Sequence, residues 1–291
     1  MRFTVSLPPD QFDLQRCIYS GQVFRWITLA EDRWQGVDGG HWYRVTQKEP
    51  GLYEVETNGD EATFRRLFRL EWDAQAIREE LLQRGPELEP YLGSLAGLRL
   101  MAPSDPVETF FSFLCTPNNH IARITTMVGA LASYGSPLEG NLYRFPEAEV
   151  VAGIPEAVLR EQKFGYRGAT IPRAAGELAR RGGRAYLESL KSASYEAAIE
   201  ALISFPGIGA KLADCIALFA LHHTEVIPVD THIWQAATRL YFPEWRETSM
   251  TDLKYKAVSR HLRERFGEYA GWAQQYLFLD SVLNWRSRAK G

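Results

Sequence analysis

The centre of this sequence reads Phe205-Pro206-Gly207-Ile208-Gly209-Ala210-Lys211. Apolar residues recur at helical spacing before it, from Tyr195 to Ser204, and after it, from Leu212 to Ala220. Proline and glycine interrupt a helix, and glycine accepts the positive φ of a tight turn. The pattern predicts two helices joined by a glycine-rich hairpin, over residues 195–222. The unpaired N–H groups and the dipole at the start of the second helix suit a phosphate diester.

Two residues beside this hairpin carry groups suited to chemistry on a sugar. Lys211 begins the second helix, and Asp230 precedes another helical stretch within Val226-Ile227-Pro228-Val229-Asp230-Thr231-His232. A neutral amine attacks C1′ of a sugar, and burial and the helix terminus are expected to lower the pKa of Lys211. A carboxylate stabilises positive charge as a base departs. Taken singly, the lysine is more often a surface charge and the aspartate only a helix cap, but together they favour catalysis.

Composition is that of an ordinary globular protein. The chain has 291 residues, of which 45% are hydrophobic and 24% charged, and its net charge is −3. Because no apolar run reaches membrane-spanning length and no signal-peptide pattern occurs, we expect a cytoplasmic location, nucleoid-associated in a prokaryote or nuclear in a eukaryote. The three isolated cysteines predict neither a disulfide framework nor an iron–sulfur cluster. The slightly negative charge argues against DNA binding by bulk electrostatics, although charge can gather on one face.

The hydrophobic pattern divides the chain into a β-rich first part and a helical remainder, an α+β fold. Alternating runs predict an antiparallel meander, with strands near 3–7, 21–27, 34–37, 42–45 and 52–56. Helices are expected at 62–68, 73–84, 107–116, 120–134, 147–152, 155–163, 170–181, 183–191, 194–204, 210–222, 231–241, 250–266 and 269–284. We place the domain boundary near residue 103, giving domains 1–103 and 104–291 that pack together without a flexible linker.

The lysine-bearing hairpin and the Pro228-Val229-Asp230 loop resemble those of the helix–hairpin–helix DNA glycosylases, and most of all the 8-oxoguanine DNA glycosylase/AP lyase family. The resemblance covers most of the chain. It implies an N-terminal twisted antiparallel sheet domain like that of TATA-binding protein, packed on an all-helical core. It implies a monomer that binds double-stranded DNA containing 8-oxoguanine and excises that base, preferably opposite cytosine. Lys211 would form a Schiff base that undergoes β-elimination, Asp230 would stabilise the sugar cation, and no cofactor would be required.

The resemblance also implies a lesion-base pocket built from separated segments. The segment Ser20-Gly21-Gln22-Val23-Phe24-Arg25-Trp26 matches one whose glycine carbonyl faces the protonated N7 of 8-oxoguanine, where guanine has a lone pair. A glycine at a strand start is otherwise usually a bulge or bend. Cys215 and Phe278 match residues that stack on the two faces of the purine, although a cysteine is more often a small buried hydrophobe. Gln274 matches a residue that binds the Watson–Crick edge, and Phe219 lines the pocket where the family often has methionine.

Two further segments match the family's contacts with the opposite strand. In Pro117-Asn118-Asn119-His120 the first asparagine matches a residue that fills the gap left by the extruded base, and extrusion costs several kcal/mol. Arg123 matches an arginine that binds the orphaned cytosine. Tyr166 and Arg167 match a ring wedged into the base stack and a second cytosine contact. The alternatives are an ordinary turn capped by asparagine and a surface Tyr-Arg pair, and His120 stands where the family has a third asparagine.

The remaining matches concern the DNA backbone. Gly207 and Gly209 would bind phosphate through the hairpin, and His232 matches a phosphate-binding histidine, with a buried core histidine as the alternative. The carbonyl groups of Ile203, Phe205 and Ile208 would hold a structural monovalent cation that bridges to a phosphate. Asp280 falls one position before the family's acidic residue, so that base contact is left without a matching side chain.

Two competing functions remain at this point. One is an enzyme for alkylated bases or abasic sites on the same scaffold, and the Gly21 segment and the pair Cys215 and Phe278 speak against it. The other is a non-catalytic helix–hairpin–helix DNA-binding module, which leaves Lys211 and Asp230 without a purpose.

Overall fold

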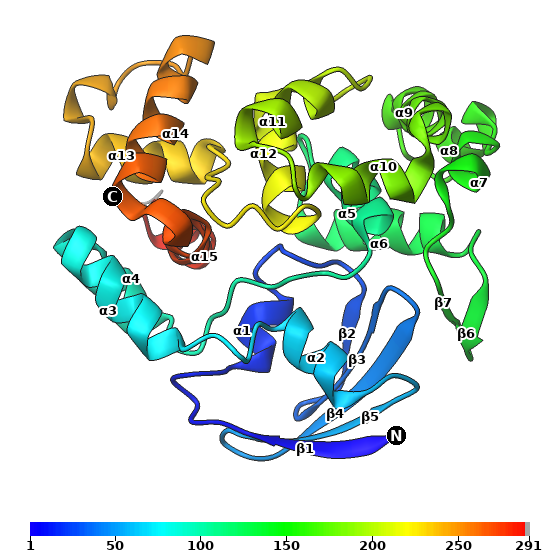
Figure 1. The fold of residues 1–291 in the computed structure, drawn as a ribbon, viewed down its shortest axis with the longest axis horizontal. Coiled ribbons are helices and arrows are strands. Elements are labelled where there is room, and N and C mark those ends of the chain that lie inside the picture. Colours follow the sequence, from blue (N-terminus) through cyan, green and yellow to red (C-terminus); the bar gives the residue numbers. More distant parts are fainter. Residues whose placement is uncertain (289–291) are drawn as a thin grey trace.

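A five-stranded antiparallel sheet supports a larger helical body in the computed structural model, which describes residues 1–288 (Figure 1). The sheet has the order β1-β5-β4-β3-β2, a meander with the first strand added to the last. Its strands are β1 Arg2–Ser6, β2 Trp26–Ala30, β3 Arg33–Asp38, β4 His41–Glu49 and β5 Leu52–Thr57. The expected meander and the α+β class are confirmed.

One predicted strand differs from the structure. The strand expected from Gly21 begins only at Trp26, and residues 21–25 form an irregular loop in which Gly21 has φ +78°. That backbone conformation favours glycine, because an L side chain there is strained. The strand start expected at Gly21 is therefore wrong, and the glycine lies in a turn ahead of the sheet.

Each expected helix is present in the described part of the chain. The short helices of the first part are α1 Leu14–Ile18, α2 Glu61–Leu67, α3 Ala74–Arg84 and α4 Glu89–Ser94. The helical body contains α5 Pro106–Leu114, α6 Ile121–Ala132, α7 Ala148–Ala152, α8 Glu156–Glu161, α9 Arg167–Arg181, α10 Gly183–Leu190, α11 Tyr195–Ile203, α12 Ala210–Phe219, α13 Thr231–Leu240, α14 Asp252–Phe266 and α15 Ala270–Arg288. Helices α1 and α4 and the small hairpin of β6 Pro137–Glu139 and β7 Leu142–Tyr143 were not expected. None of the helices described here is long and apolar enough to cross a membrane.

Two hydrophobic cores lie on either side of the segment that joins the two parts. Tyr43, Val55 and Phe64 belong to the core beneath the sheet. Helix α3 precedes residue 103, yet its Ile77 and Leu81 belong to the helical core, and the helix packs against α14 (Figure 1). Helix α3 lies before residue 103 in the chain but packs in the core of the second part, so the two cores do not follow a boundary at residue 103. That boundary remains a prediction.

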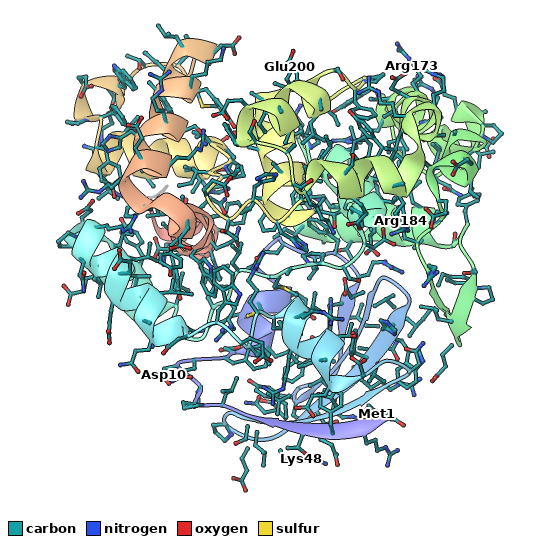
Figure 2. All side chains as sticks on the ribbon, in the orientation of Figure 1. Met1, Asp10, Lys48, Arg173, Arg184 and Glu200 are labelled. Carbon is teal, nitrogen blue, oxygen red and sulfur yellow. The ribbon has the colours of Figure 1, made fainter. Side chains whose placement is uncertain are left out.

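The connecting segment itself is buried. Leu98 and Leu100 point into the helical core, whereas Met101 belongs to the core of the sheet. Between them the Arg99 guanidinium donates to backbone carbonyl groups, including Phe68 O at 2.9 Å. Side chains fill the space between the sheet and the helices (Figure 2). The joint is held by packing and by hydrogen bonds on both sides.

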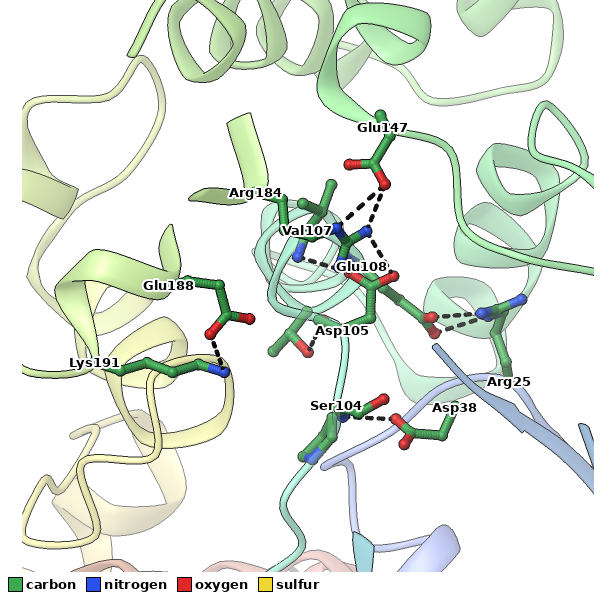
Figure 3. A network of polar contacts seen from close by, with 12 residues as sticks. Arg25, Asp38, Ser104, Asp105, Val107, Glu108, Glu147, Arg184, Glu188 and Lys191 are labelled. Carbon is green, nitrogen blue, oxygen red and sulfur yellow. Dashed lines mark hydrogen bonds and ion pairs between the residues drawn. The ribbon is translucent and has the colours of Figure 1, made fainter. Parts of the chain in front are cut away.

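A polar network crosses the same interface (Figure 3). Arg25, just before β2, makes a bidentate ion pair with Glu108 on α5, and both side chains are largely buried. Arg184 on α10 donates to Asp105 at 2.9 Å, and Asp38 at the end of β3 accepts a hydrogen bond from Ser104 N at 2.8 Å. Burial raises the pKa of Asp38 to about 7. These contacts join the sheet to the first helix of the helical body.

Candidate active site

The hairpin that joins α11 to α12 contains two glycines in different environments. Gly207 has φ +82°, and a Cβ there would lie 2.3 Å from Thr170 Cγ2 on α9. Gly209 is the N-cap of α12 with φ −100° and ψ −178°, and a Cβ there would meet no atom within 4 Å. Phe205 anchors the hairpin by packing edge-on against Phe110, with ring centroids 5.2 Å apart. The protein's own packing requires the first glycine but not the second.

Lys211 and Asp230 lie close enough for their charges to interact. Lys211 occupies the first turn of α12, and Asp230 caps α13 by accepting a hydrogen bond from Ile233 N at 2.9 Å. Burial lowers the pKa of Lys211, but interactions with Cys215 and the attraction of Asp230 outweigh burial, so that this pKa lies above its ordinary value. The expected lowering of the Lys211 pKa is therefore wrong for the DNA-free protein. The aspartate is both a helix cap and the partner charge of the lysine.

Cys215 lies one turn after Lys211 and shares its surroundings. Burial raises the pKa of the Cys215 thiol to about 11, and the nearby Lys211 ammonium partly offsets that effect. A thiol with this pKa is uncharged at neutral pH. Cys215 therefore contributes an uncharged, buried side chain next to Lys211.

Residues from four separate segments meet at Phe278. A Cβ on Gly21 would lie 3.2 Å from Phe278 Cε1 on α15 and 3.8 Å from Ile121 Cδ1 on α6. The ring of His232 on α13 packs edge-on against Phe278, with centroids 5.4 Å apart. His232 Nδ1 also lies 2.9 Å from Ser281 Oγ. The structure thus brings the predicted lesion-base residues Gly21 and Phe278 together with His232, which was predicted to bind a phosphate.

Every neighbour of Gly21 in its loop has a contact that holds the loop in place. Ser20 Oγ donates to Cys17 O at 2.7 Å. Gln22 Nε2 donates to Arg99 O at 2.9 Å, and Met101 N donates to Gln22 Oε1 at 2.8 Å. Phe24 packs edge-on against Phe113. The Gly21 backbone is therefore presented to the pocket by a loop fastened to the buried connecting segment.

The other predicted base contacts are covered by protein. Phe219 is 2% exposed and stacks on Phe113 with ring centroids 5.2 Å apart. Cys215 is buried, and so is Gln274, whose Oε1 accepts a hydrogen bond from Gln275 Nε2 at 2.5 Å. The sequence interpretation missed Gln275, whose own Oε1 has no hydrogen-bond partner among the described residues.

Two loops carry the residues predicted to contact the opposite strand, and each loop is bound to the other. Arg123 on α6 donates to Lys163 O, and Arg167 at the start of α9 donates to Pro117 O. The Tyr166 ring is 55% exposed and lies 4.6 Å from the Arg167 guanidinium. Asn118 has φ +51°. The structure therefore brings these four residues into one surface region.

The remaining differences from the sequence predictions concern the N-cap of α6 and two residues of α15. His120 caps α6 by accepting a hydrogen bond from Arg123 N at 3.3 Å, so the cap expected from asparagine is wrong. Asp280 accepts from Asn284 at 2.8 Å, and it is Ser281 that contacts His232. Ser281 and Ile121 were not among the predicted pocket residues. The helical spacing of three between Phe278 and Ser281 was the available signal for the serine.

Comparisons with known proteins agree with this geometry. Residues 4–110 match the family described as 8-oxoguanine DNA glycosylase, N-terminal domain. An N-glycosylase/DNA lyase from Arabidopsis thaliana, named OGG1, is 33% identical over 95% of this chain and 79% of its own. An N-glycosylase/DNA lyase from Saccharomyces cerevisiae is 38% identical over 64% of this chain and 57% of its own.

A solved structure shows the same fold along almost the whole chain. The Clostridium acetobutylicum 8-oxoguanine glycosylase/lyase, in complex with double-stranded DNA containing cytosine opposite 8-oxoguanine, has a TM-score of 0.82 and 28% identity. The match covers 94% of this chain and 93% of that one. The protein belongs to the 8-oxoguanine DNA glycosylase/DNA lyase family of the helix–hairpin–helix superfamily.

Proposed function

We propose that this protein is a base-excision repair enzyme that extrudes 8-oxoguanine from double-stranded DNA, cleaves its glycosidic bond and then cleaves the strand as an AP lyase. The observation that carries the proposal is the charge interaction between Lys211 and Asp230, together with the packing of His232, two residues after Asp230, on Phe278, which lies next to Gly21. An amine and a carboxylate close enough to interact are what glycosylase/lyase chemistry needs. The protein would act as a monomer wherever the cell keeps its DNA.

The raised pKa of Lys211 bears on the order of the steps. The lysine enters the reaction as an ammonium ion, which cannot attack C1′. We propose that the C1′–N9 bond breaks first, while the Asp230 carboxylate stabilises the positive charge on the sugar. The departing purine carries the bonding electron pair and takes a proton from Lys211. The neutral amine then bonds to C1′, and the C1′–O4′ bond breaks as O4′ takes the proton that the amine loses, which leaves a Schiff base. Removal of a proton from C2′ then expels the 3′ phosphate by β-elimination.

Residues from the Gly21 loop and from helices α12 and α15 would select the base. The Gly21 carbonyl would accept a hydrogen bond from N7–H of 8-oxoguanine, where guanine presents a lone pair. Cys215 and Phe278 would hold the two faces of the purine, Gln274 its Watson–Crick edge, and Phe219 would line the pocket. A polar mismatch in such a site rejects the wrong base strongly, because a buried polar group is then left unpaired.

Preference for cytosine would come from the two linked loops. Arg123 and Arg167 now donate to the backbone of the facing loop, and both would turn to cytosine once a base is extruded. Asn118 would fill the gap in the duplex, and the exposed Tyr166 ring would enter the base stack. Adenine offers a donor on that edge and no O2, so two arginines favour cytosine over it.

The hairpin would hold the DNA backbone. Gly207 would form the tight turn of the phosphate-binding hairpin, Gly209 would leave room for a phosphate at the N-terminus of α12, and His232 would bind a neighbouring phosphate. The carbonyl oxygens of Ile203, Phe205 and Ile208 are hard donors of the kind that bind monovalent cations. Phe205 O accepts one hydrogen bond, from Ile208 N at 3.2 Å, and a carbonyl oxygen has a second lone pair. A potassium or sodium ion there would bridge the hairpin to a phosphate.

Borohydride trapping tests the mechanism. The wild type should form a covalent adduct with DNA containing 8-oxoguanine opposite cytosine, and Lys211→Gln should form none. Excision is then compared on duplexes with 8-oxoguanine opposite each base and on a duplex with an alkylated purine. Equal or faster release of the alkylated purine would contradict the substrate, and equal rates opposite adenine and cytosine would contradict only the preference.

A further inference from the structure

A buried carboxylate outside the proposed reaction lies on the same helix as the lysine. Asp214 is on α12, three residues after Lys211, and is 1% exposed. Tyr195 OH, at the start of α11, donates to Asp214 Oδ1 at 2.9 Å, and Tyr255 OH on α14 donates to Asp214 Oδ2. Both carboxylate oxygens are thus bonded to phenol groups from two other helices. The cluster joins both helices of the hairpin to α14.

One of the two phenols reaches the loop that carries Asp230. Val229 N donates to Tyr255 OH at 3.4 Å. Because the proton of this phenol is committed to the Asp214 carboxylate, its oxygen is left to accept from the backbone N–H. Asp214 therefore sets the direction of the whole chain of hydrogen bonds, from Val229 through Tyr255 to α12.

Asp230 is held from both sides as a result. On its C-terminal side it caps α13 through Ile233 N, and on its N-terminal side the preceding residue, Val229, is tied to Tyr255. The other end of that tie is the helix of Lys211. The hydrogen bonds therefore connect the segment that bears the amine to the segment that bears the carboxylate.

Stability alone does not account for this arrangement. A buried carboxylate loses its hydration, and an apolar side chain of similar size would avoid that cost. Burial raises the pKa of Asp214 to about 6, although the hydrogen bonds from Tyr255 and Tyr195 act in the opposite direction. The protein thus keeps the costly Asp214 carboxylate in a position from which it orients the Tyr255 hydroxyl toward Val229.

We propose that Asp214 and Tyr255 are positioning residues that hold the Asp230 carboxylate against Lys211 for cleavage of the glycosidic bond. This inference rests on the proposed function, because it assigns Asp230 to the sugar cation. Misplacing a catalytic group by about 1 Å can lower a rate about a hundredfold. Loss of the Tyr255 hydroxyl would loosen the loop while leaving the hairpin and the pocket in place.

The two phenols provide a matched pair of variants. Tyr255→Phe and Tyr195→Phe each remove one hydrogen bond to Asp214, but only Tyr255 also contacts Val229. The measurements are the single-turnover rate of 8-oxoguanine release and the dissociation constant for a duplex with a tetrahydrofuran abasic analogue. We expect Tyr255→Phe to lower the rate about tenfold or more and Tyr195→Phe less than about threefold, with dissociation constants within about twofold of wild type.

A double variant separates positioning from general destabilisation. If Tyr255 acts through Asp230, Tyr255→Phe has no further effect on the slow residual rate of Asp230→Asn. An equal loss of rate in both backgrounds, equal losses for the two phenol variants, or a tenfold loss of affinity for the abasic analogue would each overturn the inference while leaving the proposed function intact. A wild-type protein that releases no 8-oxoguanine would overturn the proposed function, and the inference with it.

Discussion

The loop of residues 20–26 and the hairpin of residues 205–211 both present a glycine to the proposed DNA site, yet they are held in different ways. Around Gly21, the neighbouring side chains bond to or pack on the protein itself. In the hairpin, Gly209 has an extended backbone and open space where a side chain would be. Gly209 is favoured as the N-cap of α12, and the open space at its Cα would also let a DNA backbone approach.

The largest effect is expected from the hairpin lysine. Lys211→Gln removes both the group that gives a proton to the departing purine and the amine that then bonds to C1′, so single-turnover excision should fall about a thousandfold and borohydride trapping should disappear. Binding to an abasic analogue, measured by fluorescence anisotropy, should change little and serves as the control. Persistent trapping would mean that another amine does the chemistry and that the hairpin only grips DNA.

The next effect tests how firmly the Gly21 loop is anchored. Arg25→Ala leaves the largely buried Glu108 without its partner, and the free energy of unfolding should fall by about 3–5 kcal/mol in urea denaturation. Arg65→Ala breaks the exposed pair with Glu61 and should cost at most about 0.5 kcal/mol. Similar losses for the two variants would contradict the buried anchoring of the loop.

Asp38, which lies between the sheet and the helical body, should make the stability of the protein depend on pH. Burial raises the pKa of Asp38 to about 7 in the folded protein, so folding favours its protonated form. The stability due to that proton is complete below about pH 4 and is lost as pH rises through about 7, a change on the order of a few kcal/mol. Asp38→Asn removes this dependence, so the variant should gain stability relative to wild type between pH 4 and 7. A constant difference in unfolding free energy over that range would contradict the assignment.

The two hairpin glycines give the smallest and sharpest comparison. Gly207→Ala meets a positive φ and the Thr170 side chain, and should lower the free energy of unfolding by about 1–3 kcal/mol. Gly209→Ala puts a poor N-cap residue at the start of α12 and should cost up to about 1 kcal/mol of stability, but it should weaken DNA binding about tenfold. If Gly209→Ala binds the abasic analogue as tightly as wild type, no DNA backbone approaches that position.

Local sequence patterns predicted the elements well and the special loops less well. Period-2 and helical spacing located the sheet and the helices, because they depend on which side chains face a core. The strand expected at Gly21 was misplaced because a run of apolar residues, including Phe24, resembles a strand although those side chains serve loop contacts. The α6 cap was misassigned because a histidine ring nitrogen replaced the usual oxygen acceptor.

In the candidate site, too, the sequence predicted some residues and missed others. The resemblance assigned Gly21 and Phe278 to the lesion base and His232 to a phosphate, and in the structure Phe278 lies next to both of the other residues. It gave no indication of the Asp214–Tyr255–Val229 chain, whose members come from α12, α14 and a loop. Hydrogen bonds between distant elements depend on how those elements pack, and no local pattern encodes that packing.

The sequence alone was enough to predict the helix–hairpin–helix, the place of Lys211 at the start of its second helix and the cap that Asp230 forms on the following helix. These features depend on residues within one or two turns of each other, where backbone geometry sets the outcome. Folding in three dimensions decided the protonation of Lys211, because its pKa reflects burial and the charges that α12 and α13 bring beside it. Charge interactions depend on distance through space, which neighbours in sequence do not specify.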